Sequence, residues 1–306
     1  MNYSETAKNE IARLSCSTDC CKRAFMSALI RAGGSLLLGR DGIKMLLTFS
    51  DAKISEKAEK TMQEIASGIT IARDGNETLL SGENMVKVLY ALGIFYRKSS
   101  GETAVRSGIQ PSIIRDDCCA VSYVRGLFLG AGSVTLSGGY HLEFNLSHES
   151  LAQDLKKLLQ RFNVPCHTHK RAEHYLVYIK DNEAVSDCLA LMGATSAVIE
   201  LNNEYTMRQF SQQINRRNNC DIANIQKTVN ASVRIVESVR YIDATIGLAS
   251  IDEKLQEVAK ARIERPDDSF SVLADALGLS KSTLKNRFKK LDEIAEELRE
   301  KETKEK

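Results

Sequence analysis

Small and hydrophobic residues recur at helical spacing in two stretches of the chain that end in the same two residues. The first, "ALIRAGGSLLL" (28–38), matches the second, "GLFLGAGSVTL" (126–136), so that Gly34-Ser35 falls on Gly132-Ser133. In each half the match continues through an alternating strand pattern and then a second amphipathic helical pattern. This repeat predicts two copies of one structural unit.

Each copy is predicted to fold in the order α-β-β-α-β-β-α, with antiparallel hairpins between its helices. The predicted fold class is therefore α+β. A pseudo-twofold domain is expected over residues 20–208, with repeats at about 20–95 and 119–195. A separate N-terminal helix is predicted within residues 1–19.

One face of each central helix carries only small side chains. Ala28 and Ala32 are four residues apart on the first helix, as Gly126 and Gly130 are on its counterpart. This spacing puts each pair on one helix face, so that the two backbones can approach closely along a pseudo-twofold axis. The alternative is that each Gly-Ser step only ends a helix and starts a strand.

After Gly193 the pattern changes to helical segments alone. Residues 209–221 are polar and rich in Asn and Gln, and are predicted to be the end of a bridging helix and a linker. Residues 222–295 are predicted to form an all-α helix-turn-helix domain. The mixed-charge tail at 296–306 is expected to fray.

The last two helical segments have the spacing of a helix-turn-helix. Ala274 allows the second helix to cross closely, Gly278 permits the sharp turn, and Leu284 anchors the second helix. Ser280 is predicted to cap that helix. Between Ser280 and Leu291 there are five basic residues and no acid. Such a helix can place its first side chains on base edges in the major groove; the alternative is a solvated basic helix in an ordinary bundle.

We expect the side chains at DNA to come from three places: the second helix of the helix-turn-helix, the linker, and a basic hairpin in the second repeat. They are Lys281, Ser282, Thr283, Lys285, Asn286, Lys289 and Lys290 of the helix, Arg216 and Arg217 of the linker, and Lys170 and Arg171 of the hairpin.

Composition limits the class of protein. The chain of 306 residues is 43% hydrophobic, enough for two packed domains, and its formal net charge of +2 gives no global nucleic-acid signal. No stretch approaches the roughly 18 unbroken apolar residues of a membrane span, and the polar opening lacks a signal-peptide pattern. We therefore expect a cytoplasmic protein with no membrane partner.

Cysteines and histidines are the remaining candidates for chemistry. Cys20-Cys21 and Cys118-Cys119 are adjacent pairs, poorly placed to bridge each other, and reduced thiols are expected. Cys16, Cys20 and Cys21 are expected to pack in the core. His167 and His169 point to one face of a strand, without Cys-x-x-Cys or His-x-x-x-His spacing, which favours a basic strand face over a zinc site. No phosphate loop, nucleophile elbow or acid–base pair occurs, so we expect no metal, cofactor or small-molecule substrate.

The duplicated unit with its small-residue helices resembles the LAGLIDADG homing endonuclease fold. In that family the two helices pair at the centre, the two sheets form a saddle on DNA, and an acid before each helix's final glycine holds the catalytic metals. Here those positions are Gly33 and Ala131, which offer no oxygen ligand. Asp41 and Glu143 are nearby acids but are not at symmetric positions, so a residual metal-dependent endonuclease is disfavoured.

A degenerate LAGLIDADG domain followed by a helix-turn-helix resembles the WhiA family of bacterial regulators. The resemblance extends to the opening "SETAKNEIARL", to the paired cysteines before each central helix, and to "NNCDIANIQKTVNASVRIVESV" at the junction. It implies a sequence-specific transcription regulator of sporulation and cell-division genes that binds double-stranded DNA in the nucleoid and is not an enzyme. The alternative is an adaptor that binds RNA polymerase or a sigma factor and contacts DNA only weakly.

Overall fold

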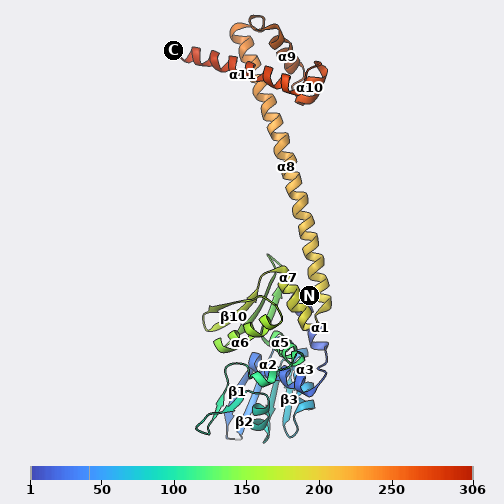
Figure 1. The fold of residues 1–306 in the computed structure, drawn as a ribbon, viewed down its shortest axis with the longest axis vertical. Helices are drawn as coiled ribbons and strands as arrows, with labels where there is room; N and C mark the ends of the chain where they lie inside the picture. Colours follow the sequence, from blue (N-terminus) through green and yellow to red (C-terminus); the bar gives the residue numbers. More distant parts are fainter. Residues whose placement is uncertain (1, 41, 305–306) are drawn as a thin grey trace. The chain divides into compact units, whose positions relative to one another are not determined.

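The computed structural model describes residues 2–40 and 42–304, and the chain divides into two compact units, Met1–Met207 and Arg208–Lys306. In the N-terminal unit both copies have the predicted α-β-β-α-β-β-α order, which confirms the fold class (Figure 1). The first copy consists of α2 (Asp19–Gly33), β1 (Gly34–Gly39), β2 (Gly42–Thr48), α3 (Ala52–Ile65), β3 (Thr70–Asp74), β4 (Glu77–Ser81) and α4 (Met85–Ala91). The second consists of α5 (Asp117–Ala131), β7 (Gly132–Thr135), β8 (His141–Leu146), α6 (Glu149–Arg161), β9 (His167–Arg171), β10 (His174–Ile179) and α7 (Asn182–Met192).

Shorter elements lie outside the two copies. The helix α1 (Tyr3–Arg13) precedes the first copy, and its Ala7 and Ile11 are buried in the core of the unit. A small hairpin, β5 (Phe95–Arg97) and β6 (Thr103–Val105), and the 3-10 helix η1 (Pro111–Ile114) connect the two copies.

The two four-stranded antiparallel sheets have the same strand order, β1-β2-β4-β3 in the first copy and β7-β8-β10-β9 in the second. One face of each sheet packs against the helices, through fully buried residues such as Leu47 and Phe144. The opposite face, which we call the open face, carries exposed residues such as Leu37 and Asn145. This division follows from the alternation of side chains along a strand.

The helices α2 and α5 pack along their small-residue faces, as the repeat predicts. A Cβ atom added at Gly126 would lie 2.5 Å from the Phe25 carbonyl oxygen and 2.7 Å from the Ala28 Cβ. One added at Gly130 would lie 2.4 Å from the Ala32 Cβ. Equivalent positions of the two copies therefore face each other, so the two helices run parallel on either side of a pseudo-twofold axis.

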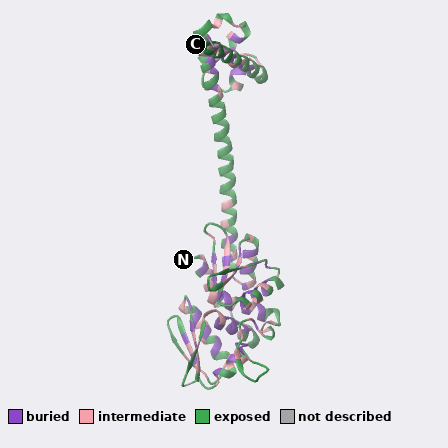
Figure 2. Ribbon diagram, turned by 90° about the vertical axis from the view of Figure 1, so that its left-hand side faces the viewer, coloured by how far each residue is buried: buried purple, intermediate pink, exposed green. Residues whose placement is uncertain are grey.

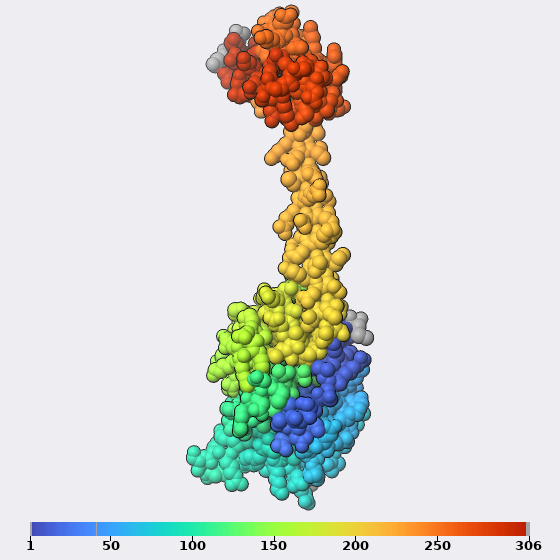
Figure 3. Space-filling model, turned by 45° about the vertical axis from the view of Figure 1, so that its right-hand side comes forward, coloured from blue at the N-terminus to red at the C-terminus, as the bar shows by residue number. Residues whose placement is uncertain are grey.

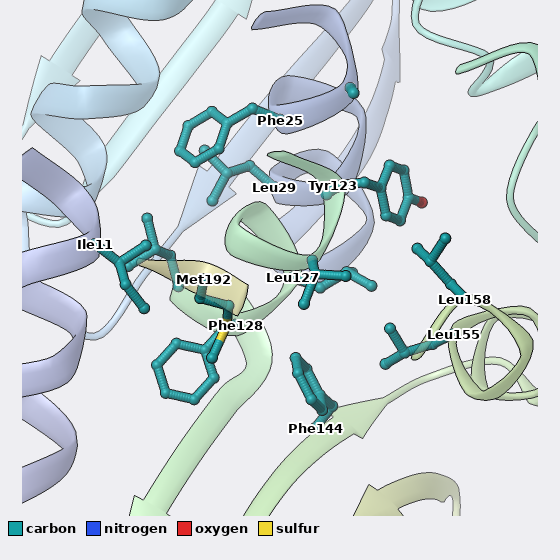
Figure 4. Packing of buried hydrophobic residues seen from close by; sticks show 14 of the residues in the cluster. Ile11, Phe25, Leu29, Tyr123, Leu127, Phe128, Phe144, Leu155, Leu158 and Met192 are labelled. Atoms are coloured by element: carbon teal, nitrogen blue, oxygen red, sulfur yellow. The ribbon is translucent and has the colours of Figure 1, made fainter. Parts of the chain in front are cut away.

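The core of the N-terminal unit surrounds this helix pair. Figure 4 shows Phe25 and Leu29 of α2 near Tyr123 and Leu127 of α5, with Phe144 of β8 below them. These side chains are at most 2% exposed. Burial of each contributes roughly 1.5–3 kcal/mol, so the paired helices and the sheets that cover them form one hydrophobic core.

The C-terminal unit is helical. Its elements are the later part of α8 (Thr195–Ile246), the 3-10 helix η2 (Leu248–Ser250), α9 (Glu253–Glu264), α10 (Phe270–Ala276) and α11 (Lys281–Lys304). A separate core joins them through Val239 and Ile242 of α8, Val258 of α9, and Leu284 and Leu291 of α11, all 0% exposed. Among the residues that the structure describes, no helix is both long enough and apolar enough to cross a membrane.

The segment at 209–221, expected as a helix end and linker, is helical along its whole length because α8 continues through it. Every residue from 209 to 230 is exposed, as the green middle part of the helix shows in Figure 2. A helix with no buried side chain over this length depends on its own backbone hydrogen bonds rather than on packing.

The expectation that the C-terminal tail frays is wrong for the residues that the structure describes. The helix α11 continues to Lys304. Arg234 Nη2 lies 2.8 Å from Glu296 Oε1, and Tyr241 Oη donates to Glu302 Oε2 at 2.8 Å. These contacts with α8 extend the helix beyond the point where its hydrophobic pattern weakens.

Candidate nucleic-acid interface

The turn between α10 and α11 has the geometry that the sequence predicts for a helix-turn-helix. Gly278 has a φ of +64°, in the left-handed region that glycine adopts without strain. The Leu279 N–H donates to the Ala274 carbonyl at 2.9 Å. Ala274 is 1% exposed and Leu284 is 0% exposed. These buried residues hold one face of α11 against its neighbours and leave the other face in solvent.

Ser280 caps the N-terminus of α11, as predicted. Its Oγ accepts a hydrogen bond from the Thr283 N–H at 3.1 Å, and it lies 2.9 Å from the Ser282 hydroxyl and 2.8 Å from the Thr283 hydroxyl. The three hydroxyls thus gather where the positive end of the helix dipole favours an anion such as a phosphate.

The face of α11 opposite the core is polar and basic. Leu284, Phe288 and Leu291 are buried on one side of the helix. Figure 3 shows the surface of these C-terminal helices in orange and red. The residues predicted to contact DNA from this helix are all exposed: Lys281, Ser282, Thr283, Lys285, Asn286, Lys289 and Lys290.

Arg287 and Lys289 of α11 have partners within the protein. Arg287 Nη1 donates to Glu257 Oε2 at 3.1 Å and to the Lys254 carbonyl at 3.3 Å, which ties α11 to α9. Lys289 Nζ lies 3.2 Å from Glu293 Oε1 at the surface. Arg287 is therefore a packing residue, and the positive charge that α11 presents to solvent is lower than the sequence alone indicates.

A buried arginine, which the sequence analysis did not single out, supports α10 and α11. Arg262 of α9 is 0% exposed, and its guanidinium carbon lies 5.3 Å from the ring centroids of both Phe270 and Phe288. Its Nη1 donates to the Pro266 carbonyl at 3.2 Å and to the Asp268 carbonyl at 2.8 Å. Burial lowers the pKa of Arg262, and the nearby Asp268 carboxylate opposes that shift. The side chain fixes the loop before α10 and the rings that orient α11.

Arg216 and Arg217 are exposed on α8. Because an α-helix rises 1.5 Å per residue, Arg217 lies about 27 Å along the helix from Ile235, where the C-terminal core begins. The structure therefore does not bring these arginines together with the polar face of α11.

Lys170 and Arg171 are exposed at the end of β9, on opposite faces of the second sheet. Lys170 is paired with Tyr175 on the face that packs against the helices, and its Nζ lies 5.6 Å from the centre of the Tyr175 ring. Arg171 is paired with His174 on the open face. Of these two residues, Arg171 alone lies on the open face, which corresponds to the DNA-facing saddle of the LAGLIDADG fold.

The open face of the second sheet also carries a row of rings. His141 of β8 and His167 of β9 flank Tyr178 of β10, with ring centroids 5.8 Å and 5.6 Å from that of the tyrosine. Lys180 Nζ lies 5.1 Å from the same ring. On β9, His167, His169 and Arg171 share the open face, whereas Lys170 does not, so only part of the predicted basic strand face is present there.

Comparison with known families covers both units. A family model described as the WhiA LAGLIDADG-like domain matches residues 120–211, and one described as the WhiA C-terminal HTH domain matches residues 214–295. A curated relative from Alkaliphilus metalliredigens (strain QYMF), "Probable cell division protein WhiA", is 33% identical over 97% of this chain and 98% of its own length. The chain belongs to the WhiA family.

Other WhiA proteins have the same extent. The relative of the same name from Brevibacillus brevis is 31% identical over 99% of both chains. A crystal structure of full-length DUF199/WhiA from Thermotoga maritima matches with a TM-score of 0.58 at 23% identity, over 97% of this chain and 99% of that chain. The similarity to that structure shows that the WhiA fold extends over both units.

In this WhiA chain Gly33 and Ala131 are the last residues of α2 and α5, the positions where LAGLIDADG endonucleases carry acids. A Cβ added at Gly33 would lie 2.7 Å from the Thr48 carbonyl oxygen and 2.8 Å from Phe49 Cε1. Position 33 therefore has no room for a side chain unless β2 and its neighbours move, and neither position supplies a metal ligand.

Glu143 is an acid close to the end of α5. Its carboxylate accepts from Ser133 Oγ at 3.3 Å and lies 3.0 Å from His141 Nε2. The residue opposite the first Gly-Ser step, at the equivalent place, is Leu46. Glu143 thus has no symmetric acidic partner there, as predicted; Asp41, the other acid considered, lies outside the described residues.

Proposed function

We propose that the chain is a sequence-specific DNA-binding transcription regulator that reads base edges through α11. The observation that carries this proposal is the exposed polar and basic face of α11, fixed by the buried opposite face of the same helix. The family model for a C-terminal HTH domain and the names of the curated relatives support the same function.

The roles of individual side chains follow from their positions around the helix. Ser282 and Asn286 are one turn apart and lie farthest from the buried Leu284 and Phe288, at the centre of the exposed face. An asparagine so placed can contact an adenine through two hydrogen bonds. Lysines on both sides of this centre would neutralise phosphates and set the register on the duplex.

Replacing Lys285 and Asn286 together by alanine is expected to weaken binding to a preferred duplex by about 1–3 kcal/mol, roughly 5- to 150-fold. The loss arises because a base contact and a phosphate contact disappear together. The duplex is one selected from a random library by the unaltered full chain. Fluorescence anisotropy at fixed salt measures the affinity, and competing duplexes measure the sequence preference.

Lys301→Ala is the matched control, because it removes an exposed lysine from the far end of the same helix. Its affinity is expected to stay close to that of the unaltered chain. If the double variant keeps both affinity and preference, α11 does not read DNA. A salt series tests the adaptor alternative, since weak binding without a steep loss at higher salt would favour a chain that acts through RNA polymerase or a sigma factor.

The other predicted DNA contacts are proposed as contacts to the sugar-phosphate backbone or to a partner surface. Arg171 is suited to this role because it shares the open face with Lys180 and the ring row. Arg216 and Arg217 are exposed on α8 and could follow a phosphate strand. Lys170 is the weakest candidate, because its ammonium lies over Tyr175 on the other face.

We propose cell-division genes, including those of sporulation, as the targets, with the protein associated with the nucleoid. The relatives named probable cell division proteins support the cell-division part of this proposal. Genome-wide crosslinking of the full chain is expected to give peaks at promoters of such genes that disappear in the Lys285→Ala/Asn286→Ala variant. Peaks that persist in the variant would assign chromosome binding to another surface.

We also propose that the chain has no nuclease activity. Two-metal cleavage needs oxygen ligands on both central helices, and Gly33 and Ala131 provide none. The unaltered chain is expected to leave supercoiled plasmid uncut in Mg²⁺, on agarose gels run with and without EDTA. Cutting by the unaltered chain that EDTA abolishes would contradict the proposal.

An acid at position 33 is also expected to lower the stability of the N-terminal unit. Gly33→Asp alone is expected to destabilise the N-terminal unit by about 1–3 kcal/mol, since its Cβ would overlap the Thr48 carbonyl. Gly39→Asp is the control, because nothing lies within 4 Å of a Cβ at that position. Equal melting temperatures for the two single variants would show that α2 can accept an acid at its end.

A further inference from the structure

The two adjacent cysteine pairs come together where the central helices begin. Cys20 and Cys21 lie in the first turn of α2, and Cys118 and Cys119 lie in the equivalent turn of α5. The Sγ atoms of Cys20, Cys21 and Cys119 all lie within 4.8 Å of one another, and Cys118 is exposed beside Cys119 in the first turn of α5, outside that group of three. We call these four residues the thiol cluster.

The close packing of α2 and α5 creates this cluster. Cys21 and Cys119 precede Ala28 and Gly126 by seven positions, or two helical turns, so they lie on the helix faces that pack together. Their Sγ atoms are 4.0 Å apart. Neither Cys-Cys pair has the sequence spacing of a metal-binding motif. The thiols of the two pairs nevertheless come together, because the two copies are related by the pseudo-twofold axis.

Core packing does not account for all four thiols. Cys21 is 1% exposed and Cys119 is 3% exposed, but Cys20 and Cys118 are exposed at the surface. The expectation that Cys20 packs in the core is therefore wrong. Two buried and two accessible thiols give a cluster that is shielded from water on one side and open to an incoming ion on the other.

The sulfur separations fit a metal ion better than a disulfide. Sulfurs at about 2.3 Å from a tetrahedral zinc ion are about 3.8 Å from one another, whereas a disulfide requires about 2.05 Å. The distance between Cys21 Sγ and Cys119 Sγ is 4.0 Å.

We propose that Cys20, Cys21 and Cys119 bind one thiophilic d¹⁰ metal ion, Zn²⁺ or Cu⁺, with the neighbouring Cys118 thiol completing the site, and that this ion joins the first turns of α2 and α5. Thiolate ligands are soft and select these ions over Mg²⁺ or Ca²⁺. The ligands come from different copies of the repeat, so the ion cross-links the two halves and stabilises the folded unit.

The test uses the full chain, reduced, treated with a chelator and kept free of oxygen. Titration with Co²⁺ is expected to give a single ion per chain, with a thiolate-to-cobalt charge-transfer band and the strong visible bands of a tetrahedral site. Zn²⁺ should then displace the cobalt. Competition with a Cu⁺ chelator separates the two ions, and the tighter of them should raise the melting temperature of the N-terminal unit.

The decisive variant is Cys20→Ser/Cys118→Ser, since both side chains are exposed and their loss leaves the core intact. Loss of a residue that only hydrogen-bonds to a metal ligand already lowers metal affinity by about 10- to 100-fold. Removing two of the thiols themselves is therefore expected to lower the affinity by at least about 100-fold. Cys220→Ser is the matched control, because it removes an exposed thiol of α8. Its affinity should equal that of the unaltered chain.

Three results would overturn the proposal. One is an unaltered chain that gives no cobalt spectrum. Another is equal metal affinity in the double variant and the control. The third is a Cys21–Cys119 disulfide found by mass spectrometry in the isolated protein, together with no metal binding after reduction.

Discussion

A Gly126→Leu substitution is expected to destabilise the N-terminal unit by about 3 kcal/mol or more. Position 126 lies where the backbones of α5 and α2 meet, and a Cβ there would lie 2.5 Å from the Phe25 carbonyl oxygen and 2.7 Å from the Ala28 Cβ. Neither atom is the far end of a flexible side chain. The helices must therefore separate, which opens the core around Leu29 and Leu127.

Thermal unfolding of the full chain, combined with hydrogen exchange, measures this effect and locates it. Peptides from α2 and α5 are expected to exchange faster, while those from α9, α10 and α11 keep their protection. Gly39→Leu is the control, because nothing lies within 4 Å of a Cβ there and surface substitutions change stability by about 0.5 kcal/mol or less. A transition temperature for Gly126→Leu as high as that of the control would mean that the close helix pair does not limit stability.

The duplicated fold could be predicted because the information that specifies it is local and repeated. Small residues at positions 28, 32, 126 and 130 identify the faces on which two backbones can approach, and no larger side chain could occupy the glycine sites. Alternating patterns then identify the strands and their buried face. The same hydrophobic patterns occur in both copies, so a helix or strand that is weakly indicated in one copy is supported by the equivalent pattern in the other.

The continuous α8 was not predicted, although the sequence contained a signal for it. Residues 195–246 include no glycine and no proline, so nothing along this stretch forces the helix to end. The polar composition of 209–221 is typical of a linker, but it is equally typical of an exposed helix. Backbone hydrogen bonding, which does not depend on a hydrophobic face, decides between the two.

The residues of α11 that we propose to contact DNA could be placed on an exposed face from the helical period alone. The side chains that α11 contacts within the protein could not be predicted, because they lie on elements distant in sequence. Arg287 is bonded to Glu257, 30 residues away on α9, and this contact turns a predicted surface charge into a packing contact. Lys170 and Arg171 are adjacent in sequence but lie on opposite faces, so a basic hairpin is not by itself a basic surface.

An Arg262→Ala substitution is expected to destabilise the C-terminal unit by about 3 kcal/mol. Hydrogen bonds of charged groups contribute about 1.5–3 kcal/mol, and a desolvated cation–π contact adds about 2 kcal/mol. Arg262 Nη1 donates to carbonyls on the loop before α10, and its guanidinium contacts the rings of Phe270 and Phe288. Because Phe288 belongs to α11, loss of the arginine should loosen the helix proposed to read DNA.

Arg265→Ala is the matched control, because Arg265 is an exposed arginine three residues from Arg262. The substitution keeps the backbone carbonyl of residue 265, which accepts a hydrogen bond from Arg262. Arg262→Lys keeps the charge but lacks the planar fork, so it should recover little of the lost stability. Denaturant unfolding with hydrogen exchange in α9 to α11 measures stability, and anisotropy with the selected duplex measures DNA binding. If Arg262→Lys matched the unaltered chain in both, charge alone would be sufficient, and the stacked guanidinium would not be what orients α11.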